Sequence, residues 1–472
     1  MLQEFQTGKK AYFKVQLKDE IHLIHMKATS VEIIEKLKAA GHEAYWAGGC
    51  VRDMLLGIEP KDFDIVTSAK PDEIEHLLEH TIPIGKQFGV ILAIKNGHNF
   101  EIATFRSDSG YSDGRRPDAV QFTNAEEDAQ RRDFTINALF YDPTQDRIID
   151  YVGGQKDLNE KLIRFIGNPD ERIKEDHLRI LRAVRFKNSY GMQYHPDTYK
   201  AIKENVALVK DISAERIKDE LNKMITGNNA GRAFEELFEI GALEILIPEL
   251  CKLKGLAQPL EYHTEGDVWD HSLLALDSLT DEEGDPGPLP AEPPSIALKW
   301  AALFHDIGKY DTFTSEGERI RYDRHAEVGA EIAKKIMNRL HFPKKVVDRT
   351  CWLIEHHMMV DPLFEMPQGR RRHWFLEPGF EELLEVYRVD AMAIKPKDLS
   401  VYEELKKLYG HEIAKLKLIP KKLLSGNDIM KILKIEPGSK VGEIQSDIRN
   451  AQLEGTLKTS AQAKKYIREK YL

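Results

Sequence analysis

The hydrophobic pattern of residues 30–40 predicts an amphipathic helix near the start of the chain. Val31, Ile34 and Leu37 fall on one side of a helix in this stretch. Ser30 directly precedes them, and serine is a favoured N-cap residue, so we expect the helix to begin there.

Alternating hydrophobic and polar residues then predict a set of short strands. Two of them are joined by Asn96-Gly97, a strong turn signal. The expected strands cover 44–47, 63–67, 90–95 and 100–105. The first 150 residues therefore form a mixed α/β unit with a small sheet.

After Lys156 the periodicity becomes helical and remains so to the end of the chain. The clearest interruption is 281–294, which is rich in proline, glycine and acidic residues. Such a composition cannot bury enough hydrophobic surface to fold, so we expect a disordered loop inside a helical domain.

Composition is that of a globular protein with several domains. The chain has 472 residues, 42% of them hydrophobic and 31% charged, which predicts two to four domains. Apolar runs are too short to span a membrane, and Met1–Lys10 is too polar for a secretory signal. The 3 cysteines are far apart without CxxC spacing, so a reducing cytoplasm is expected.

Charge is unevenly distributed along the chain. The net charge of −10 argues mildly against a nucleic-acid partner. However, 233–300 holds 15 acidic and 3 basic residues, whereas 395–472 holds 17 basic and 10 acidic ones. The basic tail suits contact with RNA phosphates, although a solvated lysine-rich helical surface would have the same composition.

A carboxylate pair, Asp62 and Asp64, is the first candidate for catalysis. On a strand, residues two apart point to the same face, and two close carboxylates repel unless a cation lies between them. Mg²⁺ prefers oxygen ligands and bridges carboxylates to substrate phosphates. Glu101, on a later predicted strand, is the best third carboxylate. The alternative is an exposed strand end without function.

The residues before this pair suit a bound triphosphate. Gly48-Gly49 lets the backbone approach a phosphate closely, and the helix that follows presents its N-terminus to an anion. Arg52 adds a charge-assisted contact. A glycine pair alone is equally consistent with a tight turn.

Together these segments resemble the signature of polymerase-β-like nucleotidyltransferases, and more narrowly the bacterial class II CCA-adding enzymes and their poly(A) polymerase relatives. Further segments agree in the order of that family. The segment 105–117 resembles its flexible loop, 131–138 its ribose-recognition motif, and Glu175–Arg179 its EDxxR motif.

This resemblance implies roles for individual residues. Asp176 and Arg179, expected as i, i+3 neighbours on one amphipathic helix, would present an acceptor and a donor to the base edges shared by C and A. Arg132 and Asp133 would contact the ribose, and Arg182 and Arg185 would bind phosphate or orient the pair. Surface salt bridging is the alternative for these helix charges. Phe134 and Ile136 are expected in the core, with Asn137 as a brace.

A second constellation resembles the HD phosphohydrolase superfamily, whose signature is H…HD…D. His271 opens an apolar helix, His305-Asp306 ends the apolar stretch 298–304, and Asp390 matches the last ligand. Imidazole and carboxylate together suit a divalent metal, namely Mn, Ni, Fe or Mg. His325 and His357 would supply a second metal, with His356 as the rival of His357. The stretch 263–269 resembles the segment before the first ligand in CCA-adding enzymes.

The resemblance implies an α+β fold in which a small mixed-sheet nucleotidyltransferase head precedes helical domains. The expected domains are a head at 28–155, a helical RNA-binding neck at 156–254, an HD domain at 255–395 and a helical tail at 396–472.

The implied activity is addition of CCA to tRNA 3′ ends from CTP and ATP with Mg²⁺. The HD domain would hydrolyse 2′,3′-cyclic or other phosphate ends. Partial enzymes that add only CC or only A, and poly(A) polymerases, share these motifs, although the complete loop at 106–117 argues against a CC-only enzyme. A third reading is an HD phosphohydrolase with an RNA-binding N-terminal module.

Overall fold

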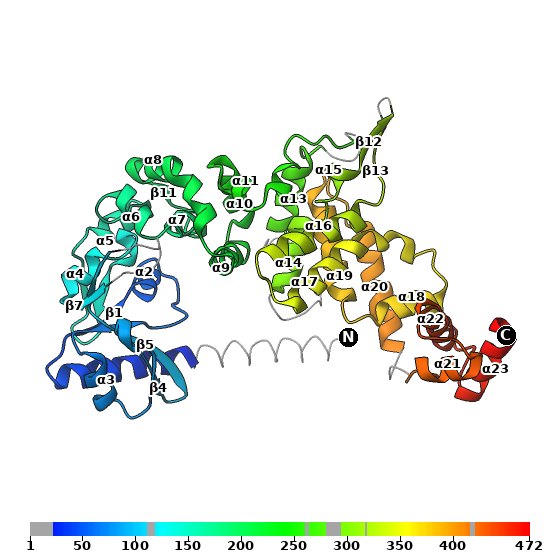
Figure 1. The fold of residues 1–472 in the computed structure, drawn as a ribbon, viewed down its shortest axis with the longest axis horizontal. Coiled ribbons are helices and arrows are strands. Elements are labelled where there is room, and N and C mark those ends of the chain that lie inside the picture. The colour runs from blue at the N-terminus through cyan, green and yellow to red at the C-terminus, as the bar shows by residue number, and fades with distance from the viewer. Residues whose placement is uncertain (1–21, 111–118, 260–263, 280–293, 317–318, 416–420) are drawn as a thin grey trace. The chain divides into compact units, whose positions relative to one another are not determined.

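The computed structural model describes residues 22–110, 119–259, 264–279, 294–316, 319–415 and 421–472. They form two compact units divided between Leu246 and Ile247 (Figure 1). Parts of three expectations lie outside the described residues: the loop around Arg115–Pro117, His263, and the acidic loop 281–294 up to position 293. Among the described helices, none is both long enough and apolar enough to cross a membrane.

A seven-stranded mixed sheet forms the centre of the head. Its strands in chain order are β1 (Ala44–Ala47), β2 (Ile65–Thr67), β3 (Thr81–Gly85), β4 (Val90–Lys95), β5 (His98–Thr104), β8 (Phe140–Asp142) and β9 (Arg147–Ile149). They are arranged as β3-β4-β5-β2-β1-β8-β9 (Figure 1). β2 and β5 run parallel, and the other neighbours are antiparallel. This arrangement confirms the predicted mixed-sheet head.

The strand predictions agree closely with the sheet. β1 and β4 have the predicted bounds, and Asn96 and Gly97 both adopt positive φ, as the tight turn between β4 and β5 requires. β2 begins only at Ile65, so Asp62 and Asp64 lie on the extended segment that leads into it. The backbone N–H of Ala47 donates to Asp64 O over 3.0 Å, which extends the β1 pairing onto that segment.

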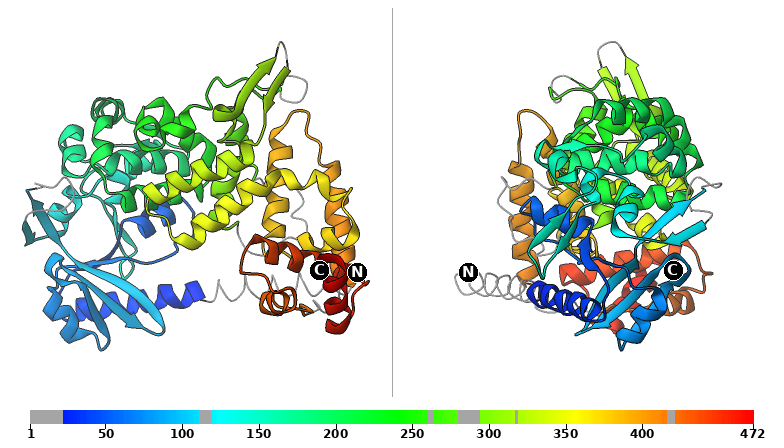
Figure 2. Two further views of the ribbon diagram at one scale, coloured as in Figure 1. Left: turned by 45° about the vertical axis from the view of Figure 1, so that its right-hand side comes forward. Right: turned by 90° about the vertical axis from the view of Figure 1, so that its left-hand side faces the viewer.

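The first helix covers described residues 22–39 and lies against the sheet (Figure 2). Ser30 is inside this helix, so its prediction as an N-cap is wrong. Its hydroxyl donates to Lys27 O over 2.6 Å and accepts from Trp46 Nε1 over 3.0 Å. The serine thus satisfies a carbonyl of its own helix and a buried indole of β1, which explains a polar residue at a buried helix position.

Helices make up most of the remainder of the first unit. They are α2 (Gly49–Leu55), α3 (Pro71–Leu77), α4 (Ala125–Gln130), α5 (Gly154–Asn159), α6 (Pro169–Glu175), α7 (Arg179–Ser189), α8 (Pro196–Asn205), α9 (Ala214–Ile225), α10 (Ala230–Glu239) and α11 (Ala242–Leu246), with the short 3-10 helices η2 (Thr135–Asn137) and η3 (Val206–Asp211). Two small strand pairs accompany them, β6 (Arg106–Ser109) with β7 (Ala119–Phe122) and β10 (Leu162–Ile163) with β11 (Gln193–Tyr194).

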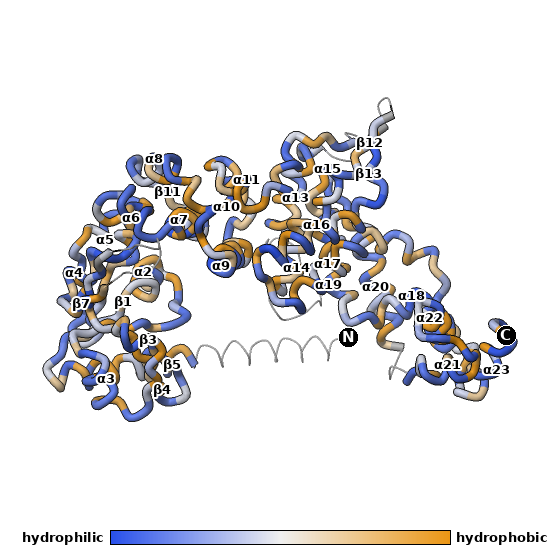
Figure 3. The backbone as a smooth tube through the Cα atoms, in the orientation of Figure 1, coloured by the Kyte–Doolittle hydropathy of each residue, from blue (hydrophilic) through white to orange (hydrophobic). Residues whose placement is uncertain are grey.

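The second unit is a helical bundle with one hairpin. Its helices are α12 (Pro248–Cys251), α13 (Val268–Asp277), α14 (Ile296–Phe304), α15 (Lys309–Thr312), α16 (His325–Arg339), α17 (Lys344–His356), α18 (Gln368–Phe375), α19 (Phe380–Ala393) and α20 (Ser400–Lys415). α14 is almost wholly hydrophobic and buried (Figure 3). The hairpin β12 (Phe313–Glu316) and β13 (Arg319–Tyr322) departs from the uniformly helical pattern that the sequence predicts after Lys156.

The tail forms a small three-helix module. Its helices are α21 (Gly426–Leu433), α22 (Ser439–Glu454) and α23 (Ser460–Tyr471), which share a buried core that includes Ile429, Ile444 and Ile467. The module docks on α18, where Arg372 Nη1 donates to Leu453 O over 2.7 Å.

Close packing at Gly154 predicts a specific loss of stability. A Cβ there would lie 2.2 Å from Thr135 O and 2.9 Å from Leu139 Cδ2, so η2 and α5 would have to separate. We expect Gly154→Ala to lower the free energy of unfolding by about 3 kcal/mol, measured by denaturant unfolding. The neighbouring Gly153→Ala has open space but a φ of +79°, and we expect it to cost only about 1 kcal/mol. Equal losses would contradict this account.

Candidate active site and candidate metal centre

The Gly48-Gly49 turn brings α2 beside the RRDFTINA segment, 131–138. Gly48 begins α2 with φ 71° and ψ −122°, a conformation that favours glycine. A Cβ at this position would lie 3.1 Å from Arg132 Nη1. The turn therefore needs glycine both for its backbone and for the approach of Arg132.

Arg52 is buried and holds α2 to the rest of the head. Its guanidinium donates to Asn137 Oδ1 over 2.6 Å, to Tyr190 Oη over 2.5 Å and to Asp53 Oδ1 over 2.9 Å. It also stacks over the Tyr190 ring, 4.5 Å from the centroid. Its phosphate contact stays a prediction, because in this structure the side chain is committed to protein partners.

Two of the three predicted carboxylates, Asp62 and Asp64, lie on the segment that leads into β2, and the third, Glu101, lies on the neighbouring strand β5. Ile65 pairs with Ile102 in the parallel β2–β5 register, which places Asp64 beside Glu101. Burial raises the pKa of Asp64 to about 6, with further increases from Asp62 and Glu101, against the opposing charge of Arg132. Asp62 and Glu101 are exposed.

This crowding of like charge is what a divalent cation would relieve, and oxygen ligands suit Mg²⁺. The three carboxylates do not form a closed metal cage in the head. Among the described residues, two groups have ligand atoms that all lie within 4.8 Å of one another, and both groups are in the second unit. The head therefore resembles an open site in which substrate oxygens would complete the ligand set.

Asp133 is the buried centre of the RRDFTINA segment. Its Oδ2 accepts from Arg182 Nη2 over 2.6 Å, and its Oδ1 accepts from the Asn137 amide over 3.1 Å. Burial alone would raise the pKa of Asp133, but Arg182 and the Asn137 hydrogen bond outweigh it and hold that pKa at about 2. Asn137 braces both Asp133 and Arg52, as predicted, and Phe134 and Ile136 are confirmed as core residues.

Arg132 lies close enough to Asp64 for its charge to lower the pKa of that carboxyl. Its Nε and Nη2 each donate to Asp128 Oδ2 over 3.1 Å, and its guanidinium stacks on Phe140, 5.1 Å from the ring centroid. Asp128 is fully buried and also holds Arg131. The sequence reasoning missed Asp128, although its i, i+3 and i, i+4 spacing to the two arginines is a recognisable signal.

The EDxxR motif lies across a helix break, which corrects the expectation of one continuous amphipathic helix. α6 ends at Glu175 and α7 begins at Arg179, with Asp176 extended between them (φ −149°, ψ 104°). Arg179 pairs with Glu175 Oε2 at 2.6 Å, whereas Asp176 pairs with Arg216 of α9 at 2.7 Å. Asp176 and Arg179 are therefore not neighbours on one helix face, because the chain leaves the helix at Asp176. Each of them is held by a different partner.

The remaining predicted arginines lie on α7. Arg182 reaches Asp133, and Arg185 donates to the buried Glu220 of α9 over 2.6 Å while its guanidinium stacks 4.1 Å from the Phe186 centroid. Arg182 and Arg185 thus tie α7 to the head and to α9. The sequence did not predict roles for Arg216 and Glu220. Their partners lie 40 and 35 positions away, and no local sequence pattern indicates such a pairing.

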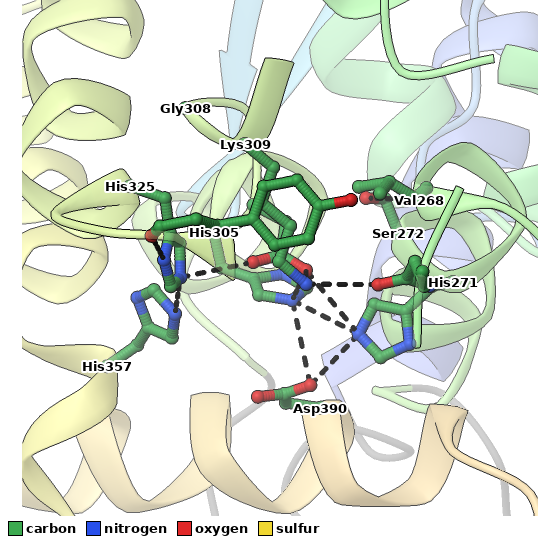
Figure 4. Close-up of polar contacts among 12 residues, drawn as sticks. Val268, His271, Ser272, His305, Gly308, Lys309, His325, His357 and Asp390 are labelled. Carbon is green, nitrogen blue, oxygen red and sulfur yellow. Dashed lines mark hydrogen bonds and ion pairs between the residues drawn. The ribbon is translucent and has the colours of Figure 1, made fainter. Parts of the chain in front are cut away.

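In the second unit, six predicted ligands converge from five parts of the bundle (Figure 4). His271 lies on α13, His305 and Asp306 follow α14, His325 begins α16, His357 follows α17, and Asp390 lies on α19. They form two triads, each with ligand atoms within 4.8 Å: His271, His305 and Asp390, and Asp306, His325 and His357.

Asp306 lies between the two triads. Its Oδ2 is 3.3 Å from His305 Nε2, and its Oδ1 is 3.4 Å from His325 Nε2. The sequence grouped Asp306 with His271, His305 and Asp390, whereas in the structure its carboxylate lies about equally far from one histidine of each triad, with one oxygen toward each side. A carboxylate in this position can bridge two cations.

Residues around the triads orient the histidines. Glu265 Oε1 is 3.0 Å from His271 Nδ1, and the carbonyl oxygens of Ala302 and Ile354 lie against His305 Nδ1 and His357 Nδ1. Each of these three histidines therefore turns its Nε2 toward the centre, as metal-binding imidazoles do. His356 instead turns its Nδ1 to Trp352 O and stacks between tryptophans, away from both triads.

Electrostatics in the cluster also suit cations. Burial opposes charge on His271, but Asp390 and Glu265 outweigh it and raise its pKa to about 9. Burial lowers the pKa of His357 to about 4, with His305 adding to the effect. Lys309 Nζ lies 2.6 Å from Asp306 Oδ2. The cluster therefore holds acidic and imidazole groups whose charges a metal pair would balance.

Gly308 explains how the two ends of the cluster meet. A Cβ there would lie 2.1 Å from His325 O and 2.6 Å from Gly329 N. Only glycine allows the turn after Asp306 to touch the first turn of α16. Glu265, Gly308 and Lys309 were missed as site residues, although Gly308 and Lys309 come only two and three residues after Asp306.

Three family models match the sequence in order. They are the poly A polymerase head domain at residues 44–164, the probable RNA and SrmB-binding site of polymerase A at 191–254, and the HD domain at 268–385. The predicted carboxylates Asp62, Asp64 and Glu101 fall in the first of these matches, and the predicted metal ligands of the second unit except Asp390 fall in the last.

Curated relatives are CCA-adding enzymes. The chain is 40% identical to that of Limosilactobacillus reuteri over 53% of this chain and 63% of the relative, and 45% identical to that of Staphylococcus saprophyticus over 44% and 52%. The chain thus spans between half and two thirds of the length of these relatives.

Solved structures align over nearly the whole chain. The CCA-adding enzyme of Bacillus stearothermophilus in complex with CTP is 27% identical with a TM-score of 0.64, covering 93% of this chain and 96% of that one. The Thermotoga maritima CCA-adding enzyme with tRNA is 19% identical with a TM-score of 0.53 over 94% and 95%, and shares the fold. The chain therefore contains, in this order, segments that match a poly A polymerase head domain, an RNA-binding segment and an HD domain, and it is similar to CCA-adding enzymes.

Proposed function

We propose that this protein adds CCA to the 3′ ends of tRNA, using CTP and ATP. The observation that carries the proposal is the convergence of Asp62, Asp64 and Glu101 in a head whose EDxxR groups, Asp176 and Arg179, are each held by a separate partner. The named relatives and the CTP complex of the Bacillus enzyme support the same substrates.

The carboxylates supply the site for transfer. Asp62, Asp64 and Glu101 would hold Mg²⁺, which activates the attacking oxygen and neutralises the leaving pyrophosphate when bound. Arg132 lies close enough to Asp64 to lower its pKa, so it adds positive charge next to the same site. In the reaction the tRNA 3′ oxygen bonds to the α-phosphorus, and the bond to pyrophosphate breaks.

Selection of C and A rests on donors and acceptors. Both bases present an amino donor next to a ring-nitrogen acceptor, whereas U and G present the opposite order. The Asp176 carboxylate accepts from the amino group, and the Arg179 guanidinium donates to the ring nitrogen. Asp133, fixed by Arg182 and Asn137, contacts the ribose hydroxyls together with Arg132.

The HD cluster supports a second activity, hydrolysis of phosphate esters such as 2′,3′-cyclic ends of RNA. Its two triads with Asp306 between them would hold two divalent cations, Mn, Ni, Fe or Mg, which supply Lewis-acid activation of a phosphate when bound. Lys309, beside Asp306, offers a positive charge to the phosphate. Such an activity would clear damaged ends before nucleotides are added.

A nucleotide-addition assay tests the main proposal. The protein is incubated with Mg²⁺, CTP and ATP on tRNA transcripts that lack CCA, lack only the terminal A, or are complete. We expect two C and one A on the transcript that lacks CCA, one A on the transcript that lacks only A, and no addition to the complete tRNA. Asp64→Asn should lower the rate of addition by at least about 1,000-fold, because a carboxylate that holds the metal is lost. A long A tail on any RNA, or C addition alone, would contradict CCA addition.

The raised pKa of Asp64 predicts a pH-dependent metal requirement. Below pH 6 the carboxyl holds a proton that a cation must displace, so the Mg²⁺ concentration for half-maximal addition should rise about tenfold per pH unit, and level off above pH 6. Glu101→Gln removes one of the charges that raise this pKa and should move the inflection to lower pH. A metal requirement that is constant between pH 5 and 7 would contradict this prediction.

Metal content and hydrolysis test the HD activity. Wild-type protein should bind two divalent cations per chain at this cluster and hydrolyse 2′,3′-cAMP with added Mn²⁺ or Ni²⁺. His271→Ala should reduce hydrolysis by at least about 100-fold because a ligand is lost. His356→Ala, next to a ligand but outside both triads, is the matched control and should retain activity. Background hydrolysis by the wild-type protein under every metal would refute this second function.

A further inference from the structure

Asp176 occupies an unusual position for a residue that must be held still. It lies in the break between α6 and α7 with an extended backbone, so no helix face fixes its side chain. Its Oδ1 accepts from the backbone N–H of Leu178 over 3.1 Å, and its Oδ2 accepts from Arg216 Nη2 over 2.7 Å. The carboxylate is therefore fixed from two sides, one local and one from α9.

α9 contributes charges of both signs at positions one helical turn apart. Arg216 reaches Asp176, while Glu220, only 2% exposed, accepts from Arg185 of α7. A shift of α9 along its axis would break both pairs at once, because i and i+4 side chains share a helix face. This double attachment sets the position of α9 relative to the EDxxR break.

The partner of Arg179 shows why this matters for base selection. Arg179 Nη1 donates to Glu175 Oε2 and to Arg172 O, so the guanidinium is fixed independently of Asp176. If Asp176 and Arg179 paired with each other, they would satisfy each other rather than a base. A carboxylate has about four acceptor positions, so Asp176 keeps capacity for an amino group after accepting from Leu178 and Arg216.

We propose that Arg216 is a positioning residue for nucleotide selection, which fixes the direction of the Asp176 carboxylate and so sets the preference for C over U. This role rests on the proposed CCA addition. The proposal gives α9 a part in nucleotide specificity. Arg216 acts through Asp176 and lies outside the EDxxR motif.

Kinetics on a tRNA transcript that lacks CCA test this role. The preference for CTP over UTP is measured as the ratio of kcat/KM in wild type and in Arg216→Ala. Losing a hydrogen bond to a charged group corresponds to about tenfold to a hundredfold, so we expect the ratio to fall by about tenfold or more, mainly through a higher KM for CTP. Arg216→Lys keeps the charge but loses the planar fork, and should recover part of the preference.

Two further variants separate positioning from general damage. Arg232→Ala removes an exposed arginine of α10, paired with Glu239, and should leave the preference unchanged. If Arg216 acts through Asp176, then Arg216→Ala should cause little further loss of preference in an Asp176→Asn background. Thermal unfolding establishes that each variant is folded, and Arg216→Lys decides the matter if Arg216→Ala does not fold.

The outcomes are distinguishable from failure of the proposed function. Wild-type protein that adds no C or A contradicts CCA addition and, with it, this role. Wild-type protein that adds both, combined with a folded Arg216→Ala or Arg216→Lys that keeps the full preference for CTP, overturns only the role of Arg216. Additive losses from the Arg216 and Asp176 substitutions would overturn it as well.

Discussion

The buried ion pair between Asp133 and Arg182 is the interaction on which the head depends. It connects the segment after β7 and α4 to α7, and together with the Asn137 hydrogen bond it holds the pKa of Asp133 at about 2, although burial alone would raise that pKa. Through Asn137, the same carboxylate is linked to Arg52 and hence to the Gly48 turn. A buried charge without its partner is costly, so every element of this network constrains the others.

Both candidate sites gather ionisable groups that a bound cation would balance. In the head, burial raises the pKa of Asp64, and the nearby carboxylates of Asp62 and Glu101 raise it further. In the second unit, Asp306 belongs to one triad and lies 3.3 Å from His305 of the other, and both triads sit among buried helices. The head carboxylates lie at β2 and β5 in the middle of the sheet, and Asp62 and Glu101 are exposed, so a substrate could approach them. The HD cluster is enclosed by five parts of the bundle, which suits cations that remain bound.

Much of the fold was predictable because local pattern and tertiary structure agree there. β1, β4 and the Asn96-Gly97 turn follow from alternation and turn chemistry, and the separate helical unit follows from its periodicity. Ser30 was misjudged because its hydroxyl serves Trp46, a residue 16 positions later, instead of a helix start. The β12–β13 hairpin was missed because it lies within a helical unit and pairs only with itself.

The sequence by itself determined the candidate residues: Asp62 and Asp64 in the head, the EDxxR and RRDFTINA segments, and the histidines and aspartates of the HD cluster. Only the tertiary structure decided how these residues are paired. Because the helix breaks at Asp176, Arg179 pairs with Glu175, and Asp176 pairs with Arg216. The fold also divides the HD ligands into two triads, and Asp306 of one triad lies next to the other. The physical reason is that a charged side chain pairs with whatever opposite charge the packed backbone brings within reach, and that partner can lie anywhere along the chain.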